Sequence, residues 1–297
     1  MTHNTPSTAH SPHPTPAGPV LVVGATGKTG SRVAALLEVR GHDIRRASRS
    51  SDIVFDWTDR STWAPTLAGA GPVYLTYQPD LIAPGATDDI AEFVRLADEA
   101  GVPRLVLLAG RGEAEADAAG RLVHAARAES TVLSCAWFDQ NFTEGGFAPE
   151  IAAGSLTLPV GDVGEPFIDA DDIAAVAVAA LLEVTADGDN PHAGRTYDCT
   201  GPRLLTFAEA AAEFGRARGA VVTFTEVSSA DYRDLLRQFD VPAPEVELLL
   251  VLFGKLFDGR NAYISDDVER VLGRPPRDIV DVAAAWTRSA AQERVSR

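Results

Sequence analysis

The chain has 297 residues, of which 45% are hydrophobic and 23% are charged. This length suits one large α/β domain, or a nucleotide-binding domain with a modest second lobe. Acidic residues outnumber basic ones by 42 to 26, giving a formal net charge of −16 that would repel a nucleic-acid backbone. Composition therefore excludes nucleic acid as an expected partner.

Apolar runs and cysteines disfavour further classes of protein. No apolar run reaches the roughly 18 residues that a membrane-spanning helix needs. We therefore expect a soluble, cytoplasmic protein without a membrane partner. The two cysteines, Cys135 and Cys199, lie inside apolar, strand-like runs. They predict neither a disulfide framework nor a metal site.

Residues 1–18 are polar and rich in proline, without the basic start and apolar centre of a signal peptide, and they predict a disordered tail. After the tail, short runs rich in Val, Ile and Leu alternate with helical patterns. Strands are predicted at Val20 to Val23, Asp43 to Ser48, Ile53 to Phe55, Val73 to Tyr77, Arg104 to Leu108 and Thr131 to Cys135. Runs without strict alternation indicate strands buried on both faces, as in parallel sheets with helical crossovers. The predicted fold class is therefore α/β, a Rossmann-type doubly wound sheet.

The second half of the chain has a looser rhythm. We expect a helix over Asp171 to Glu183, a strand over Arg195 to Cys199 and a helix over Thr206 to Arg218. A Thr-x-x-Glu capping box opens the last of these. Residues 242–257 predict an amphipathic helix that covers one side of the sheet. The predicted organisation is an NADP-binding Rossmann domain over residues 19–150, with residues 151–297 forming mainly a smaller, interwoven α+β substrate lobe.

The stretch VGATGKTG, residues 23–30, combines features of two phosphate-binding loops. Its Gly-Lys-Thr is typical of a P-loop, but that motif also requires a glycine at position 22, where the chain has valine. A dinucleotide loop instead needs a strand, glycines at a tight turn, and a helix whose N-terminal N–H groups face a pyrophosphate. All three occur here in that order. We assign the dinucleotide cradle to Gly24, Thr26, Gly27, Lys28, Thr29 and Gly30.

The end of the second predicted strand indicates which dinucleotide is bound. An acidic residue there would hold a ribose 2′-hydroxyl, but this chain has Ser48, Arg49 and Ser50. Arginine forms bidentate, charge-assisted hydrogen bonds to phosphate. The three residues therefore predict a site for the 2′-phosphate of NADPH.

Several motifs together resemble the NmrA-like branch of atypical short-chain dehydrogenases. They are GATGKTG, SRS, FDW at 55–57, WFDQNF at 137–142 and PFIDADDIA at 166–174, and the resemblance extends over about residues 20–286. It implies that Asp56 and Trp57 border the adenine. It also implies that residues 77–79 and 109–111, with Ala109 and Gly110 among them, line the nicotinamide side. Each of these residues also suits a plain role as loop or core.

The chain departs from the wider superfamily at its catalytic acid. The usual acid is a Tyr four residues before a Lys that lowers the phenol pKa, and none of the five tyrosines has a lysine at that spacing. The catalytic residues are therefore unknown. Candidates are Tyr77, His124 on the helix expected to carry the acid, and Asp139 and Asn141 after the sixth strand. Asp139 equally suits a helix cap, and His124 an ordinary helix histidine.

Two kinds of function remain open. In the first, the protein is an enzyme in which proximity of NADPH and substrate supplies most of the rate, and water or a substrate phenol supplies the proton. Some relatives in the branch it resembles tailor aromatic polyketides in antibiotic biosynthesis, so we expect a ketoreductase acting on a polycyclic aromatic ketone. Trp137, Phe138 and Phe142 are its predicted substrate contacts. In the second, the protein is a non-catalytic NADP(H) redox sensor. A quinone reductase is a further alternative, and the oligomeric state is left open.

Overall fold

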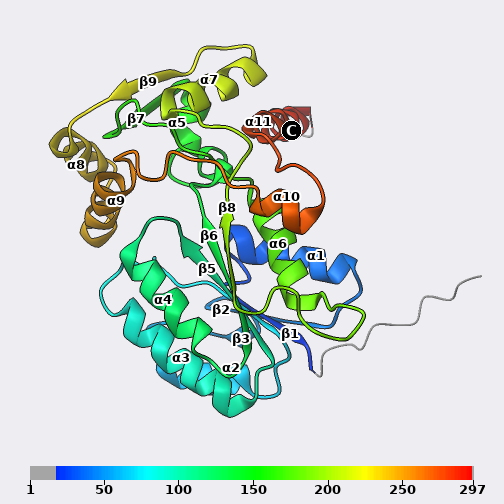
Figure 1. The fold of residues 1–297 in the computed structure, drawn as a ribbon. Helices are drawn as coiled ribbons and strands as arrows, with labels where there is room; N and C mark the ends of the chain where they lie inside the picture. Colours follow the sequence, from blue (N-terminus) through cyan, green and yellow to red (C-terminus); the bar gives the residue numbers. More distant parts are fainter. Residues whose placement is uncertain (1–17, 296–297) are drawn as a thin grey trace, which may run out of the picture.

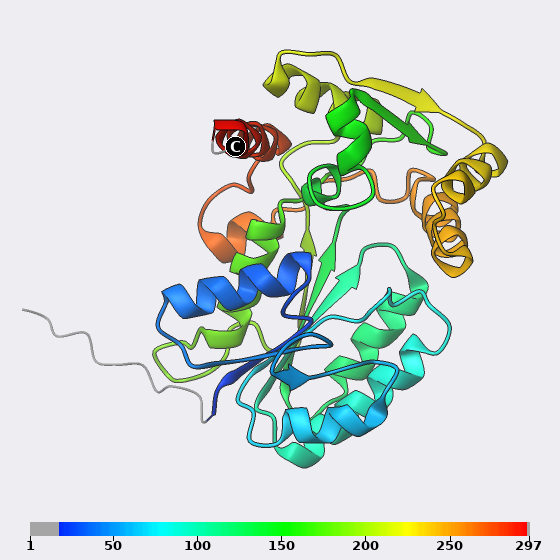
Figure 2. The same cartoon turned by 180° about the vertical axis from the view of Figure 1, so that it is seen from behind.

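The computed structural model describes residues 18–295, so the predicted tail lies almost wholly outside the described residues. A seven-stranded sheet has helices on both faces, and a second lobe lies beyond the carboxyl ends of its strands (Figures 1 and 2). Every adjacent pair of its strands is parallel, in the order β3-β2-β1-β4-β5-β6-β8. The strands are β1 (Val20–Val23), β2 (Ile44–Ser48), β3 (Ile53–Val54), β4 (Val73–Leu75), β5 (Arg104–Gly110), β6 (Glu129–Cys135) and β8 (Arg195–Cys199).

Each strand of the sheet centre is buried on both faces. In β1, Leu21 and Val23 belong to a core shared with helices α2, α3 and α4, whereas Val20 and Val22 face a second core under α1, α6 and α10. These helices are α1 (Lys28–Val39), α2 (Trp63–Leu67), α3 (Ala86–Ala100), α4 (Ala114–His124), α6 (Ala170–Leu182) and α10 (Asp267–Leu272). A short 3₁₀ turn, η1 (Arg60–Thr62), leads into α2. The doubly wound Rossmann-type fold class is confirmed.

The second lobe is built around an aromatic core. Its elements are η2 (Asp139–Phe142), α5 (Ala148–Ala153), β7 (Ser155–Leu158), α7 (Phe207–Arg218), β9 (Thr223–Glu226), α8 (Ser229–Gln238), α9 (Ala243–Leu256) and α11 (Ile279–Val295). Strands β7 and β9 form a separate parallel pair. Phe142, Phe207 and Phe214 are fully buried between these elements. Thr206 forms the expected capping box with Glu209 at the start of α7.

After entering the second lobe, the chain returns to the seven-stranded sheet and its helices. Helix α6 packs on α1, and β8 continues the large sheet beside β6, with Cys199 in register with Cys135. Both cysteines are buried and free. Within residues 18–295, no helix is long and apolar enough to cross a membrane. In the same residues, no group of three or more His, Cys, Asp or Glu is arranged to hold a metal ion.

The helix predicted over residues 242–257 lies at a different place in the fold from the one expected. It is present as α9, but it pairs with α8 at one side of the second lobe (Figure 1). The prediction that it covers a side of the sheet is wrong. Its apolar residues, including Leu248 and Leu252, face a cavity beyond the ends of the strands.

Candidate active site

The loop between β1 and α1 brings three glycines into close contact with neighbouring atoms. Gly24 has φ of +78°, and a Cβ on it would lie 2.1 Å from Thr76 Oγ1. A Cβ on Gly30 would lie 2.2 Å from the carbonyl oxygen of Gly24. The Gly27 N–H donates to that same carbonyl at 2.9 Å. A side chain at Gly24 would thus push against Thr76, and one at Gly30 would force the loop and helix apart, so the glycines let the backbone turn as a dinucleotide loop requires.

Helix α1 begins with free polar groups at its N-terminus. Among the described residues no side chain caps α1 at Gly27, and its first turn has no acidic residue. Thr26 and Gly27 are exposed, whereas Thr29 is buried. Lys28 lines the large cavity, and burial lowers the pKa of its ammonium group. This geometry suits the binding of an anion, such as a pyrophosphate, at the helix N-terminus.

Ser48, Arg49 and Ser50 lie together at the end of β2. The Ser48 hydroxyl is buried, where it lies 2.7 Å from Ser51 Oγ and accepts from the Ser50 N–H at 3.2 Å. Arg49 is exposed, and its guanidinium donates to Gln78 Oε1 at 3.3 Å. Within the described chain Arg49 forms no ion pair, so its charge is available to a phosphate.

Asp56 and Trp57 follow β3 but differ in exposure. Asp56 is half-exposed and accepts from the N–H and hydroxyl of Thr58, which lowers the pKa of its carboxyl. Trp57 is 8% exposed, and its indole donates to the Thr76 carbonyl at 3.0 Å. It belongs to the core between the sheet and α3. Only its small exposed edge is free to border an adenine.

A large cavity of about 1640 Å³ lies beyond the carboxyl ends of β4, β5 and β6. Lys28, Gln78 and Gly110 line it on the sheet side, and α8 and α9 line it on the far side. Ligands of α/β sheets bind at this edge, and pockets for single small ligands usually measure roughly 300–1000 Å³. The cavity therefore has room for a nicotinamide ribose and a bulky substrate together.

The predicted aromatic substrate contacts divide into two groups. Trp137 and Phe138 line the cavity, and Trp137 packs against Phe257 at a ring separation of 5.5 Å. Phe142 is fully buried in the second-lobe core and does not reach the cavity. Phe147, which is not one of the three predicted contacts, also lines the cavity next to Trp137. The structure thus brings two of the three predicted contacts to the cavity.

Tyr77 and His124 lie outside the large cavity. The Tyr77 phenol donates to Asp89 Oδ2 at 2.9 Å, and burial together with that carboxylate raises its pKa to about 12. His124 contacts Ser130 Oγ at 2.9 Å and Thr196 Oγ1 at 3.0 Å, near the amino ends of β6 and β8. Burial lowers the pKa of His124. With Ala109, it lines a separate cavity of about 210 Å³.

The two candidates after β6 have opposite surroundings. Asn141 lines the large cavity but cannot donate a proton as an acid. Asp139 is completely buried, and neither of its carboxyl oxygens has a partner among the described residues. Burial, with the nearby Asp169, Asp278 and Asp172, raises its pKa well above the usual range. Asp139 is thus part of the junction between lobes.

Sequence reasoning missed a group of acids in the cavity wall: Asp80, Glu113 and Glu165. Burial raises the pKa of Glu165 to about 7, and its Oε1 accepts from the Trp137 N–H at 2.9 Å. Asp80 and Glu113 lie within hydrogen-bonding reach of each other. Their local sequence is typical of acids in turns and at helix starts, so only the fold reveals that they meet.

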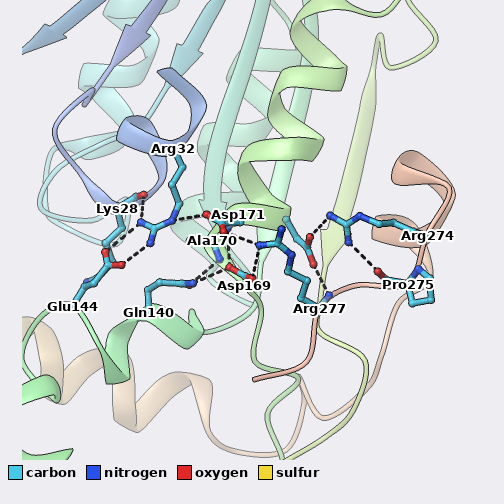
Figure 3. Close-up of polar contacts among 11 residues, drawn as sticks. Lys28, Arg32, Gln140, Glu144, Asp169, Ala170, Asp171, Arg274, Pro275 and Arg277 are labelled. Carbon is cyan, nitrogen blue, oxygen red and sulfur yellow. Dashed lines mark hydrogen bonds and ion pairs between the residues drawn. The ribbon is translucent and has the colours of Figure 1, made fainter. Parts of the chain in front are cut away.

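A polar network joins the first lobe to the second beside the dinucleotide loop (Figure 3). Arg32 of α1 contacts Glu144 and, at 2.8 Å, Asp171 at the start of α6. Gln140 donates to Asp169 at 2.7 Å and accepts from the Ala170 N–H at 2.8 Å. The completely buried Asp172 holds Arg274 at 2.6 Å. The PFIDADDIA motif therefore fixes the second lobe and the C-terminal segment to the Rossmann layer.

The chain is similar to known proteins over nearly its whole length. No family model matches the sequence. The uncharacterized oxidoreductase YesF of Bacillus subtilis is 31% identical, over 91% of this chain and 96% of that protein. The NADPH-dependent quinone oxidoreductase of Escherichia coli, solved with NADPH, has a TM-score of 0.71 at 18% identity, over 90% of this chain and 99% of that one.

The transcriptional regulator NmrA, solved with NAD, has the same fold, with a TM-score of 0.66 at 16% identity over 90% of this chain and 95% of that one. The similarity to YesF is close enough, and covers enough of both chains, to show common membership of one family. The chain belongs to the NmrA-like branch of the atypical short-chain dehydrogenases/reductases, the family whose motifs its sequence resembles.

Proposed function

We propose that this oxidoreductase uses NADPH to reduce a ketone on a bulky, polycyclic aromatic compound. The observation that carries the proposal is the position of the large cavity, which extends from Lys28 in the dinucleotide loop to the aromatic wall at Trp137 and Phe147. Bound NADPH supplies a hydride. The chain supplies the site that brings hydride and ketone together and excludes water.

The cofactor residues have distinct proposed roles. Gly24, Thr26, Gly27, Thr29 and Gly30 form the loop around the pyrophosphate, with Lys28 beside it. Arg49, with Ser48 and Ser50, binds the 2′-phosphate, and Asp56 and the edge of Trp57 border the adenine. Gly110 lies at the end of β5, where the nicotinamide would lie, with Ala109 buried behind it. Trp137 and Phe138 contact the substrate.

A non-catalytic NADP(H) sensor and a quinone reductase are the rival functions. A sensor that binds only the dinucleotide has no need of a cavity this large, which favours an enzyme. Quinone reduction uses the same cavity and cofactor, and differs from ketone reduction mainly in how much proton assistance the acceptor needs.

Turnover of NADPH separates these functions. NADPH oxidation is followed by absorbance against a panel of polycyclic hydroxyketones and quinones, while NADPH binding is followed separately by tryptophan fluorescence. We expect binding together with turnover of at least one aromatic ketone. Binding without turnover of any acceptor would favour the sensor, turnover of quinones alone would favour the quinone reductase, and no binding would refute all three.

A further inference from the structure

Asp80 and Glu113 place two carboxyl groups together in the wall of the large cavity. Asp80 comes from the loop after β4, and Glu113 stands at the start of α4. Two carboxyl groups in contact do not both ionise readily, because the two negative charges repel each other. The Asp80 carboxyl therefore raises the pKa of Glu113 and favours a Glu113 side chain that keeps its proton.

The Glu113 side chain has a position that a structural role does not explain. Glu113 is the N-cap residue of α4, yet its carboxyl does not cap the helix. It lies against Gly110, where a Cβ on that glycine would be 2.0 Å from Glu113 Oε1. Its second oxygen is buried and without a partner among residues 18–295. The carboxyl thus occupies the space of a missing side chain at the end of β5, beside the proposed nicotinamide site.

The charges around Glu113 favour its neutral form. Burial, then the Asp80 carboxyl, then Glu115 of α4 raise its pKa to about 8. Lys255 of α9 opposes this effect, but its ammonium group pairs with Glu115 at 3.2 Å. Burial also raises the pKa of Asp80, which is half-exposed and so within reach of solvent. A carboxylic acid in such surroundings is available at neutral pH as a proton donor.

We propose that Glu113 is the catalytic acid of the reductase and that Asp80 returns its proton from solvent. This role rests on the proposed ketone reduction. As the carbonyl carbon receives the hydride with its electron pair, the C=O π electrons move to oxygen, and the oxygen takes the proton of the Glu113 carboxyl. The products are an alcohol and the oxidised dinucleotide. Glu113 is left as a carboxylate and is reprotonated through Asp80.

Glu113→Gln tests the acid directly. With α-tetralone, which lacks a neighbouring phenol, we expect kcat at pH 7 to fall by about 100-fold or more, the usual contribution of a general acid. Affinity for NADPH should stay within about threefold, because the substitution removes no group of the cofactor loop. Wild-type kcat should fall as the pH rises through about 8, where Glu113 ionises. Retention of ketone turnover with an unchanged pH profile would overturn the proposal.

Two further variants test the role of the neighbouring Asp80 and provide a control. Asp80→Asn removes the neighbouring charge, so the alkaline limb of the profile should move to lower pH by roughly one unit. Asp117→Asn is the matched control: it removes an exposed acid from the first turn of the same helix but leaves the pair intact, so kcat should change by less than about threefold. An alkaline limb that stays in place in Asp80→Asn would contradict the role of the pair.

An infrared measurement is independent of turnover. The difference spectrum between wild type and Glu113→Gln should contain the band of a protonated carboxyl at pH 6, lost as the pH rises through about 8. A carboxylate band at pH 6 would refute the protonated pair. If that band is present but neither α-tetralone, its peri-hydroxylated derivative nor menadione is reduced, the proposed reduction has failed while the acid pair stands.

Discussion

Arg49 differs from the two arginines of the adjoining strand in what its guanidinium contacts. Arg45 donates to the carbonyls of Thr66 and Ala68, and Arg46 pairs with Glu38 at 2.8 Å. Arg49 has only the amide oxygen of Gln78 as a partner within the described residues. We therefore propose that preference for the phosphorylated dinucleotide depends on Arg49, an exposed cation at the end of the second strand.

Replacing Arg49 by Ala should weaken NADPH binding by roughly tenfold or more while leaving NADH binding nearly unchanged, because charge-assisted hydrogen bonds to the 2′-phosphate are lost. Fluorescence titration with both dinucleotides measures the ratio of the two dissociation constants. Arg46→Ala serves as the control, since its guanidinium is held by Glu38, and it should leave that ratio unchanged. An unchanged ratio in Arg49→Ala would remove this residue from the 2′-phosphate site.

Sequence reasoning was more successful for backbone-defined residues than for side chains. The glycine spacing of residues 24–30 predicts a tight strand-to-helix turn, and the turn is present with its close contacts. In contrast, Phe142 and Trp137 lie in the same short motif, yet one is enclosed by the second-lobe core and the other lines the cavity. Which aromatic ring faces a ligand depends on elements distant in sequence.

At the scale of elements, helix α1 and its loop fit together with no spare space. The clash at Gly30 would involve the backbone oxygen and carbon of Gly24, at 2.2 and 2.8 Å from an added Cβ. Backbone atoms cannot move aside as a flexible side chain does. The helix must therefore tilt or the loop must open if residue 30 gains a side chain.

Gly30→Ala should cost about 1–3 kcal/mol of unfolding free energy and raise the dissociation constant for NADPH by at least about tenfold. Urea unfolding and fluorescence titration measure the two quantities. Gly254→Ala is a matched control within helix α9, because a Cβ there meets no atom within 4 Å. The control should be neutral or slightly stabilising. Normal NADPH binding by Gly30→Ala would contradict the cradle assignment.

Predictions of strands were accurate through the first half of the chain, with ends displaced by two residues or fewer. Strands β1 and β4 are buried on both faces, and such burial leaves a continuous apolar signal. Helix α9 shows the limit of this reasoning. An apolar helix face predicts that the face is turned away from bulk water. The pattern is the same whether that face packs on a sheet or, as here, lines a cavity.

At the scale of the whole molecule, an acidic cluster lies where the two lobes join. Asp139 is enclosed near Asp169, Asp172 and Asp278. Arg203, whose positive charge opposes the increase in the Asp139 pKa, forms an ion pair with Asp278 at 2.7 Å. With a raised pKa, Asp139 favours the folded state only while it is protonated. Its contribution to stability is present below the unfolded-state pKa and is lost as the pH rises through the folded-state pKa.

Asp139→Asn should therefore become more stable relative to wild type as the pH increases from 5 to 8. While only the folded state retains the proton, each pH unit changes the difference in unfolding free energy by up to about 1.4 kcal/mol. Urea unfolding at several pH values measures this difference. Asp187→Asn, at an exposed position, should show no such trend. A pH-independent difference for Asp139→Asn would mean that Asp139 is ionised in the folded protein.

The hairpin of α8 and α9 determines which part of the cavity can change independently of the rest. The two helices pack on each other and form the wall of the cavity opposite the sheet, with Phe239 between them 73% exposed. The glycine loop and the Asp80–Glu113 pair belong to the other wall. Substitutions in the hairpin should therefore reshape the space for a substrate while the proposed sites of the hydride donor and the proton stay unchanged. The hairpin is thus the place where a substitution should alter the accepted substrate with the least effect on NADPH binding.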